Sequence, residues 1–313
     1  MVSLNKKQIL EMVSIKEAIH AMKSAFIHLS NGIAHIPPRL NFDFPDKNAT
    51  SLVMPAYAIG NQYYCVKIVS INYSNPKKGL PLIHSVIQVF NASQGNQIAT
   101  FDGESITAIR TAAASGLATN LMAKKDASIC TIFGTGVQAA FHMKAIMEIR
   151  NIEKFIIFSR NEDTAAKFCD LHKKNIKCEI GSKKTLKKSD IICTTTSSKI
   201  PLIKFEEIRP GCHLNVIGSH QPMMREVSSD IIIQSKIIVD QIEACKKEAG
   251  DLIIPMKEGI WSFENVHGEL GMVVNGTIPS RESENEVTLF KSVGNAIQDL
   301  TMVNLIMEKL NHD

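Results

Sequence analysis

The chain has 313 residues, which is longer than most single hydrophobic cores, so the length predicts about two domains. With 44% hydrophobic and 21% charged residues the composition is that of a globular protein, and no apolar run is long enough to span a membrane. The first twenty residues mix charged and apolar positions and lack the pattern of a signal peptide, so we expect a cytoplasmic protein.

The net charge of +4 is small for this length, and the densest lysine run, "GSKKTLKKSD", is more typical of a solvated helix face than of a nucleic-acid surface. Seven cysteines are scattered along the chain, and none forms a C-x-x-C pair. We therefore expect reduced thiols, no disulfide framework, no metal site and no nucleic-acid partner.

The N-terminal segment predicts an amphipathic helix followed by strands. Apolar residues recur at helical spacing and stop near Asn31 and Gly32; they are Ile15, Ile19, Met22, Phe26 and Leu29. Residues 63–72 and 82–103 are rich in β-branched and aromatic residues, and "NASQG" within the second stretch indicates a hairpin turn. The pattern favours an antiparallel α+β domain.

From Ser105 the residues become small and helix-forming, and beyond them apolar strands alternate with helical stretches. The expected strands end at polar or glycine-bearing loops and lie within 128–133, 154–159, 189–197, 212–219 and 236–241. This rhythm is typical of a doubly wound parallel sheet. The closing stretch, 286–310, has a helical pattern and indicates a return to the first domain without a further strand.

A glycine turn lies between the expected strand at 128–133 and the helix that follows it. Gly134, Gly136 and Ala139 form G-x-G-x-x-A, which the dinucleotide fingerprint allows because its third position only has to be small. Gly134 permits a tight turn, and Gly136 lets the backbone approach a pyrophosphate at the helix N-terminus. The strand–turn–helix context favours a nucleotide site over a structural glycine turn.

The next strand ends in Phe158, Ser159 and Arg160, where NAD-binding proteins commonly place an acid that contacts the ribose. An arginine at this point can accept a 2′-phosphate, so the sequence favours NADP(H) as cofactor, with NAD(H) as the other possibility. The alternative for Arg160 is a solvated loop residue.

Several motifs, in the same order along nearly the whole chain, resemble the ornithine cyclodeaminase/mu-crystallin family. They are "PPR" ending at Arg39, "LVMPAY", "VKIVSINYSNPKKGLP", "TAIRTAAASGLAT", "GTGVQA", "IVDQIEACKKEAGDL", "GELG" and "TLFKSVGNAIQDL". The resemblance implies a Rossmann-type parallel sheet inserted into an α+β substrate-binding and dimerisation domain. We expect the first domain to cover 1–120 and 289–313, and the dinucleotide-binding domain to cover 121–288.

The resemblance also implies a site for the α-carboxylate of the substrate, formed by Arg39, Lys67 and Arg110 near the nicotinamide. Guanidinium groups bind carboxylates bidentately, and the lysine has a second possible role as proton donor or acceptor. The positions that match cofactor contacts are Arg110, Thr111, Gly134, Gly136, Val137, Gln138, Ser159, Arg160, Thr195, Gly218, Ser219 and Ser292.

Two positions depart from the cyclodeaminase pattern. His220, in "GSHQP", stands where those enzymes carry a catalytic aspartate, and Leu52 stands where they carry an acid. A carboxylate suits the terminal ammonium of ornithine, whereas an imidazole suits proton transfer at an imine nitrogen. The alternative for His220 is a residue that only fills space.

These observations favour an NAD(P)-dependent oxidoreductase that acts on a small α-amino or α-imino acid, such as a ketimine or pyrroline-2-carboxylate reductase or an amino-acid dehydrogenase. An ornithine cyclodeaminase and a non-catalytic NADP(H)-dependent binding protein are the alternatives. The family resemblance implies a homodimer.

Overall fold

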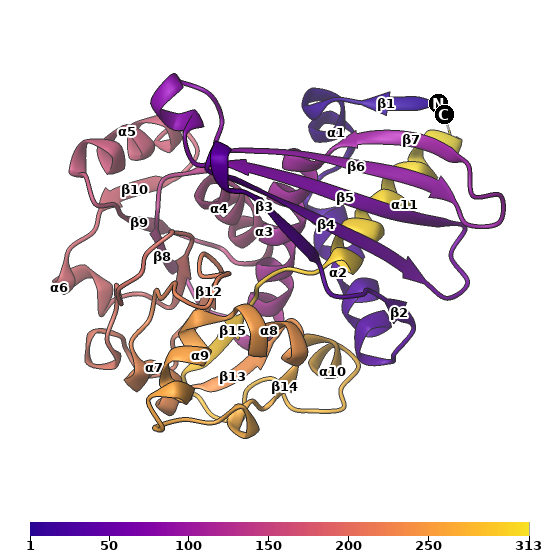
Figure 1. The fold of residues 1–313 in the computed structure, drawn as a ribbon. Helices are drawn as coiled ribbons and strands as arrows, with labels where there is room; N and C mark the ends of the chain where they lie inside the picture. Colours follow the sequence, from indigo (N-terminus) through magenta and orange to yellow (C-terminus); the bar gives the residue numbers. More distant parts are fainter. Residues whose placement is uncertain (313) are drawn as a thin grey trace. The chain divides into compact units, whose positions relative to one another are not determined.

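The computed structural model describes residues 1–312, and the contacts among them divide the chain into two compact units (Figure 1). Unit 1 comprises Met1–Thr111 and the segment that begins at Asn295, and unit 2 comprises Ala112–Gly294. No helix within 1–312 combines the length and the apolar character that crossing a bilayer requires.

Unit 1 contains a seven-stranded sheet with the order β1-β7-β6-β5-β4-β2, in which β3 also pairs with β4. The strands are β1 (Val2–Leu4), β2 (Ala34–His35), β3 (Leu40–Phe44), β4 (Ala49–Ala58), β5 (Tyr63–Asn72), β6 (Ile83–Asn91) and β7 (Gln97–Asp102). The helices are α1 (Lys6–Met12), α2 (Ile15–Ser30), α11 (Ala296–His312) and the short 3-10 helices η1 (Pro45–Lys47) and η2 (Asn75–Lys78). The pairs are antiparallel apart from β1 and β7, which are parallel, so the sheet expected to be antiparallel is mixed at one edge.

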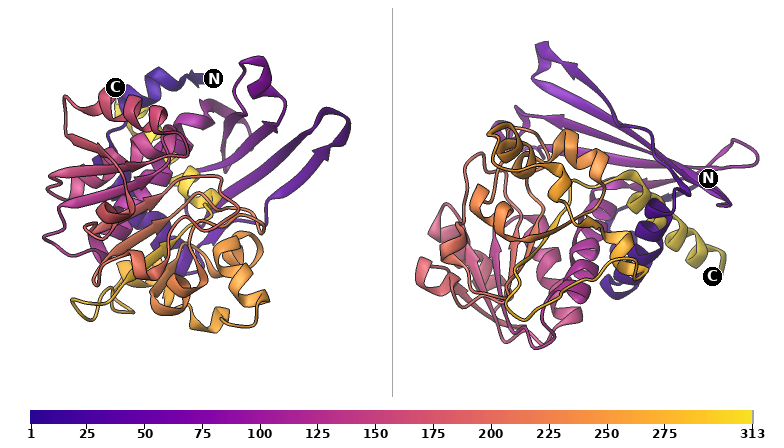
Figure 2. Two further views of the ribbon diagram at one scale, coloured as in Figure 1. Left: turned by 90° about the vertical axis from the view of Figure 1, so that its left-hand side faces the viewer. Right: turned by 90° about the horizontal axis from the view of Figure 1, so that it is seen from below.

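The helix expected over Ile15–Leu29 is confirmed as α2. Ser14 caps its first turn in a capping box with Glu17, and the helix ends at Ser30, with Asn31 as its C-cap before Gly32, whose φ is +69°. The hairpin at "NASQG" joins β6 to β7, as expected. Helices α2 and α11 pack together on the same side of the sheet, with α11 against β4 and β5 (Figures 1 and 2).

Unit 2 contains an eight-stranded parallel sheet with the order β10-β9-β8-β11-β12-β15-β13-β14. The strands are β8 (Ile129–Phe133), β9 (Lys154–Phe158), β10 (Lys177–Ile180), β11 (Ile191–Thr194), β12 (His213–Val216), β13 (Lys236–Val239), β14 (Gly268–Glu269) and β15 (Thr288–Lys291). The helices are α4 (Val137–Ile149), α5 (Glu162–His172), α6 (Lys183–Leu186), α7 (Ser229–Gln234), α8 (Ile242–Glu248), α9 (Gly250–Lys257), α10 (Leu270–Val274), η3 (Phe205–Glu207) and η4 (Phe263–Asn265). The long helix α3 (Gly103–Met122) begins in unit 1 and ends in unit 2.

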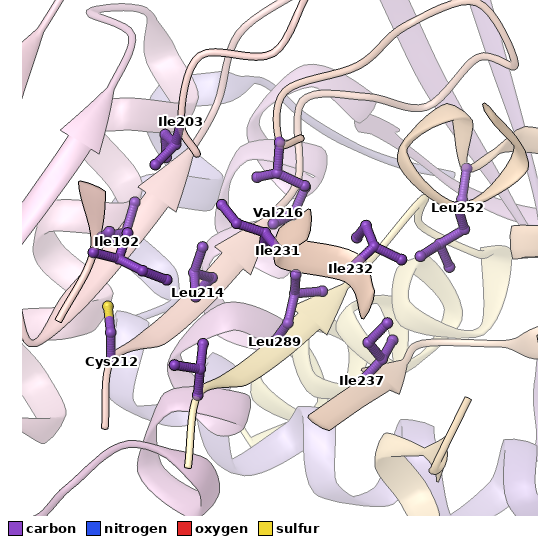
Figure 3. Close-up of a cluster of buried hydrophobic side chains, with 14 of the residues drawn as sticks. Ile192, Ile203, Cys212, Leu214, Val216, Ile231, Ile232, Ile237, Leu252 and Leu289 are labelled. Carbon is purple, nitrogen blue, oxygen red and sulfur yellow. The ribbon is translucent and has the colours of Figure 1, made fainter. Parts of the chain in front are cut away.

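Alternate residues of β11 belong to two different hydrophobic cores. Ile192 lies in a core with Ile231 of α7 and Leu252 of α9 (Figure 3), whereas Ile191 and Cys193 lie in a second core that also contains residues of α4 and α5. Successive side chains of a strand point to opposite faces, so helices cover both faces of this sheet. The doubly wound parallel sheet expected from the sequence is confirmed.

The interpretation of 286–310 as helical without a further strand is wrong. Residues Thr288–Lys291 form β15, which lies between β12 and β13 in the parallel sheet and is buried throughout. A four-residue strand that is buried on both faces is too short to show a pattern that distinguishes it from a buried helix. The contacts accordingly place the end of unit 2 at Gly294 rather than at residue 288.

Candidate active site

Gly134 follows β8 directly and has a backbone conformation that suits only glycine. Its φ is +113°, and a Cβ atom there would lie 2.7 Å from Oγ1 of Thr195. The Gly134 N–H donates to the carbonyl of Phe158, at 2.9 Å. The turn therefore brings together the ends of β8, β9 and β11.

The protein itself does not require glycine at position 136, where the backbone has an ordinary extended conformation. Gly136 is the N-cap of α4, it provides no side-chain cap, and a Cβ atom there would meet no protein atom within 4 Å. The first residues of α4 are Val137, which is 57% exposed, and the half-buried Gln138. An open helix N-terminus of this kind fits the pyrophosphate of a dinucleotide.

The residues expected around the cofactor follow the carboxyl ends of neighbouring strands. Along the sheet they are Ser159 after β9, Gly134 after β8, Thr195 after β11, Gly218 after β12 and Ser292 after β15. The strand order reverses at β8, because β9 lies on one side of it and β11 on the other. Ligands of open α/β sheets bind at such a reversal, so the structure brings these positions to the edge where a dinucleotide fits.

No acid stands at the end of β9. The Ser159 hydroxyl is hydrogen-bonded to the Thr164 hydroxyl at 2.6 Å, and Arg160 is exposed on the loop before α5. Asn161 caps that helix by accepting from the N–H of Asp163. The exposed guanidinium of Arg160 is therefore the positively charged group with which a ligand at this loop can interact.

Gly218 and Ser219 rest on Glu226, a fully buried acid that the sequence interpretation missed. Its carboxylate accepts from the N–H groups of Gly218 and Ser219, at 2.7 and 3.1 Å, and also from Thr194 and Thr196. A Cβ atom at Gly218 would lie 2.0 Å from the carbonyl oxygen of Thr196, so this close approach of the two loops requires glycine. The loops after β11 and β12 are therefore held by one side chain.

Asp251 and Lys291 complete the buried network below these loops. Asp251 accepts from the N–H groups of Glu226 and Val227, at 2.7 and 3.0 Å, and pairs with Lys291 at 3.0 Å. The Lys291 ammonium also donates to the carbonyls of Ser219 and Val216. The network thus fixes the backbone on both sides of Gly218.

Ser292 is buried, and its hydroxyl donates to Asp240 at 2.8 Å. The same Asp240 oxygen accepts from the N–H groups of Val293 and Gly294. The Ser292 hydroxyl is thus engaged within the protein. Asp240 directly follows the apolar residues 237–239, and Asp251 directly precedes the apolar residues 252–254; this was the signal in the sequence that both acids are buried.

His220 lies on the loop after β12, where its side chain is exposed. Its Nδ1 is 2.9 Å from the carbonyl oxygen of Gly218. A carbonyl only accepts, so Nδ1 carries the hydrogen in this bond, and Nε2 takes no part in it.

In unit 1, Lys67 of β5 reaches a buried polar cluster. Its side chain is 2% exposed, and its ammonium donates to the Thr107 hydroxyl at 2.5 Å and to Asp299 of α11 at 3.1 Å. Burial lowers the pKa of Lys67 from 10.5 to about 8; the charge of Asp299 opposes this, and the charges of Arg110 and Arg39 add to it. The ammonium is charged at neutral pH and close to releasing its proton.

Arg110 of α3 belongs to the same cluster. Its guanidinium donates to Gln298 at 2.6 Å, and its Nε lies 3.4 Å from the Asp299 oxygen that also meets Lys67. Half-buried Arg39, just before β3, is near enough for its charge to act on Lys67. The three cations expected to bind a carboxylate thus act on one region of unit 1, and Thr111 follows Arg110 in a buried position.

Several buried polar atoms of this cluster have no hydrogen-bond partner in the described part of the chain. They are Nε of Arg110, Nε2 of Gln298, Oδ2 of Asp299 and both side-chain amide atoms of Asn295. Buried polar groups are normally paired, so a cluster of unpaired ones indicates a site that a polar ligand completes. The sequence interpretation missed Asn295, Gln298 and Asp299. Across residues 1–312 no group of three or more potential metal ligands comes together.

A model of the ornithine cyclodeaminase/mu-crystallin family matches residues 1–313. The chain belongs to this family. The resemblance inferred from the motifs is therefore confirmed. Over 313 aligned residues the chain is 32% identical to a Delta(1)-pyrroline-2-carboxylate reductase of Bacillus cereus, and the alignment covers 98% of this chain and 95% of that protein.

Two solved structures of family members are similar over the whole chain. Thermococcus litoralis Delta(1)-pyrroline-2-carboxylate reductase, in complex with NADH and L-proline, has a TM-score of 0.94 at 38% identity, and the match covers 100% of this chain and 98% of that one. An archaeal alanine dehydrogenase dimer with bound NAD has a TM-score of 0.93 at 29% identity, covering 100% of this chain and 96% of that one.

Proposed function

We propose that this protein is an NAD(P)-dependent oxidoreductase that reduces a small cyclic α-imino acid of the pyrroline-2-carboxylate class to the corresponding α-amino acid. The observation that carries the proposal is the buried cluster of Lys67 and Arg110 around Asp299, whose unpaired polar atoms call for a polar ligand. The relatives named above act on imino and amino acids of this kind.

The cations of unit 1 are assigned to the substrate carboxylate. Arg110 offers a guanidinium whose Nε has no hydrogen-bond partner, and Lys67 has two of its three N–H groups engaged, which leaves one for a ligand. Arg39 adds a third positive charge. Charged hydrogen bonds of this type are the strong ones, and a forked guanidinium also orients the carboxylate.

Reduction of a C=N bond requires a hydride at carbon and a proton at nitrogen. The nicotinamide, when bound, supplies the hydride. For the proton we assign two candidates: Lys67, with its pKa near 8, and His220, whose Nδ1–H is held by Gly218 so that Nε2 exchanges the proton.

For the cofactor, the exposed Arg160 and the absence of an acid at the end of β9 favour NADPH over NADH. Gly134, Gly136, Val137 and Gln138 would hold the pyrophosphate at the start of α4. The loops that carry Thr195, Gly218 and Ser219 would line the rest of the dinucleotide, and Ser292 would support that edge through Asp240.

The test is to incubate the purified protein with NADPH or NADH and a candidate imino acid while absorbance is followed. We expect oxidation of the dinucleotide with Δ1-pyrroline-2-carboxylate or its six-membered homologue, and formation of one amino acid for each dinucleotide consumed. Conversion of ornithine to proline with ammonia release and no net redox change would instead identify a cyclodeaminase. No turnover with any substrate would favour a binding protein.

The role of His220 is tested with His220→Ala and His220→Asp. Loss of turnover in the alanine variant at unchanged affinity for the dinucleotide supports proton transfer by the imidazole. Unchanged turnover would assign the proton to Lys67 instead.

We further propose a homodimer formed through β3. This strand has one pairing partner, β4, within the described residues, and the alternating Leu40, Phe42 and Phe44 are 61%, 42% and 39% exposed. A row of apolar side chains on an edge strand is a pairing surface. Light scattering on the protein and on Phe42→Asp should give a dimer and a monomer, respectively; a monomeric unmutated protein would remove the proposal.

A further inference from the structure

Asp299 occupies the centre of the unit 1 cluster. It lies in the first turn of α11 and is completely buried, and a single one of its oxygens lies 3.1 Å from Nζ of Lys67 and 3.4 Å from Nε of Arg110. The two cations come from different elements, β5 and α3. One carboxylate oxygen therefore sets the distance between them.

Thr107 is the second hydrogen-bond partner of Lys67, and it restricts how the ammonium can be oriented. The Thr107 hydroxyl donates its hydrogen to the carbonyl of Gly103, at 2.6 Å, so it can only accept from Lys67. The ammonium is thus held by two acceptors, a neutral hydroxyl and the charged Asp299. Its remaining hydrogen has a fixed direction.

Among residues 1–312, Asp299 is the counter-ion of Lys67. From α3 and from the segment before β3 it faces Arg110 and Arg39, which both disfavour the ammonium, while Asp299 of α11 favours it. On β5 itself the neighbour is the Cys65 thiol, whose pKa is raised by burial, so the thiol carries no charge. Without Asp299, Lys67 would stand buried between two like charges.

We propose that Asp299 is a positioning residue: it aligns Lys67 with Arg110 and supplies the counter-charge that keeps Lys67 cationic, so that both side chains receive the substrate carboxylate. The proposal rests on the function proposed above. Asp299 acts through the two cations and needs no contact with the substrate. The proposal predicts that removing the negative charge of Asp299 changes the pH at which the substrate stops binding.

The experiment compares the unmutated protein with Asp299→Asn. KM and kcat for the imino acid are measured as a function of pH at saturating NADPH. In the unmutated protein kcat/KM should fall as pH rises through about 8, where Lys67 loses its proton. In Asp299→Asn we expect the fall at a pH lower by at least about one unit, with KM raised about twofold or more at neutral pH, because about half or more of Lys67 is then uncharged. A uniform loss of activity with the fall at the same pH as before would overturn the proposal.

Two variants and one binding measurement make the outcome specific. Lys67→Arg removes the titrating group, so the fall near pH 8 should disappear. Asp299→Glu keeps the charge but displaces the carboxylate, so the fall should stay near pH 8 while KM rises; an unchanged KM would also overturn the proposal, and this variant carries the test if Asp299→Asn does not fold. The Kd for NADPH should be nearly the same in all of them, because the residues assigned to the pyrophosphate and the 2′-phosphate lie in unit 2 and are unchanged.

Failure of the proposed function is recognised separately. If the unmutated protein turns over no imino acid but binds L-proline, the proposed function is wrong, and the pH dependence of proline binding in Asp299→Asn decides this inference in the same way. If the unmutated protein neither turns over an imino acid nor binds proline, the proposed function and the role proposed for Asp299 are both wrong.

Discussion

Within the described part of the chain, the buried ionic cluster of unit 1 and that of unit 2 differ in how completely they are hydrogen-bonded. In unit 2, Glu226, Asp251 and Lys291 have hydrogen-bond partners at every side-chain oxygen and at the ammonium. In unit 1, Lys67 and Arg110 meet around Asp299, but Nε of Arg110, which forms only a 3.4 Å ion pair, and one Asp299 oxygen have no hydrogen-bond partner, and neither do amide atoms of neighbouring side chains.

This difference indicates that the unit 2 cluster stabilises the fold, whereas the unit 1 cluster binds a ligand. A fully paired buried network stabilises one arrangement of the backbone, in this case the loops after β11 and β12. A cluster with unpaired buried groups lowers the stability of the protein unless a ligand supplies the missing hydrogen bonds. Its presence is therefore explained by ligand binding and not by stability. Substitutions in the unit 2 cluster should therefore lower stability, whereas substitutions in the unit 1 cluster should lower activity and leave stability unchanged or higher.

The largest effect on stability is expected for Glu226→Ala. It leaves buried donors of Thr194, Thr196, Gly218 and Ser219 without an acceptor, and breaking a buried ionic network costs about 3–5 kcal/mol. Denaturant unfolding measures the loss, and Glu243→Ala, an exposed acid of α8, is the control that should leave the midpoint unchanged. A Glu226→Ala protein as stable as its parent would contradict the structural role.

The largest effect on activity is expected for Lys67→Met. It removes one charged hydrogen bond to the substrate, worth about 1.5–3 kcal/mol, so kcat/KM should fall about 10- to 150-fold. The unfolding midpoint should stay the same or rise, because Asp299 keeps Arg110 as partner and an apolar side chain replaces a buried charge. Lys7→Met, a lysine of α1 whose side chain is 83% exposed, should alter neither. A loss of stability with unchanged kcat/KM would reverse the roles of the two clusters.

Stability and substrate affinity should change in opposite directions with pH. The pKa of Lys67 is about 8 in the folded protein and 10.5 as its ordinary value, so between these values the unfolded chain binds more protons and stability rises with pH. Over the same interval Lys67 loses the charge that binds a carboxylate, and affinity falls. Denaturant midpoints measured across this interval should lose the rise in Lys67→Met; a rise of the same size in that variant would assign it to another group.

Local features of the fold were predictable from the sequence, whereas the buried clusters were not. The glycine turn and the strands around it were predictable, because backbone conformation at Gly134 and the alternation of strands with helices are local properties. Strand β15 was missed because its four residues run into a helix with only Gly294 to mark the change. Glu226 and Asp299 were missed because an acid on a short loop or in the first turn of a helix is usually solvated, and only the tertiary fold shows that both are buried.

A smaller effect, confined to the cofactor, is expected for Arg160→Ala. If the guanidinium binds the 2′-phosphate, NADPH should bind roughly 10- to 150-fold more weakly, which corresponds to about 1.5–3 kcal/mol, and NADH should bind as before. Fluorescence titrations with both dinucleotides measure this, with Lys173→Ala on the surface after α5 as a control. An unchanged NADPH/NADH ratio would return Arg160 to the role of a solvated loop residue.

The assignment of the unit 1 cluster to the substrate carboxylate is tested most directly by calorimetric titration with L-proline and with pyrrolidine, which is the same ring without the carboxylate. In the presence of the oxidised dinucleotide we expect proline to bind and pyrrolidine to give no measurable heat. Lys67→Met and Arg110→Leu should each weaken proline binding by about tenfold or more, since each removes a charged hydrogen bond. Pyrrolidine binding as tightly as proline, or proline binding that survives both substitutions, would contradict the assignment.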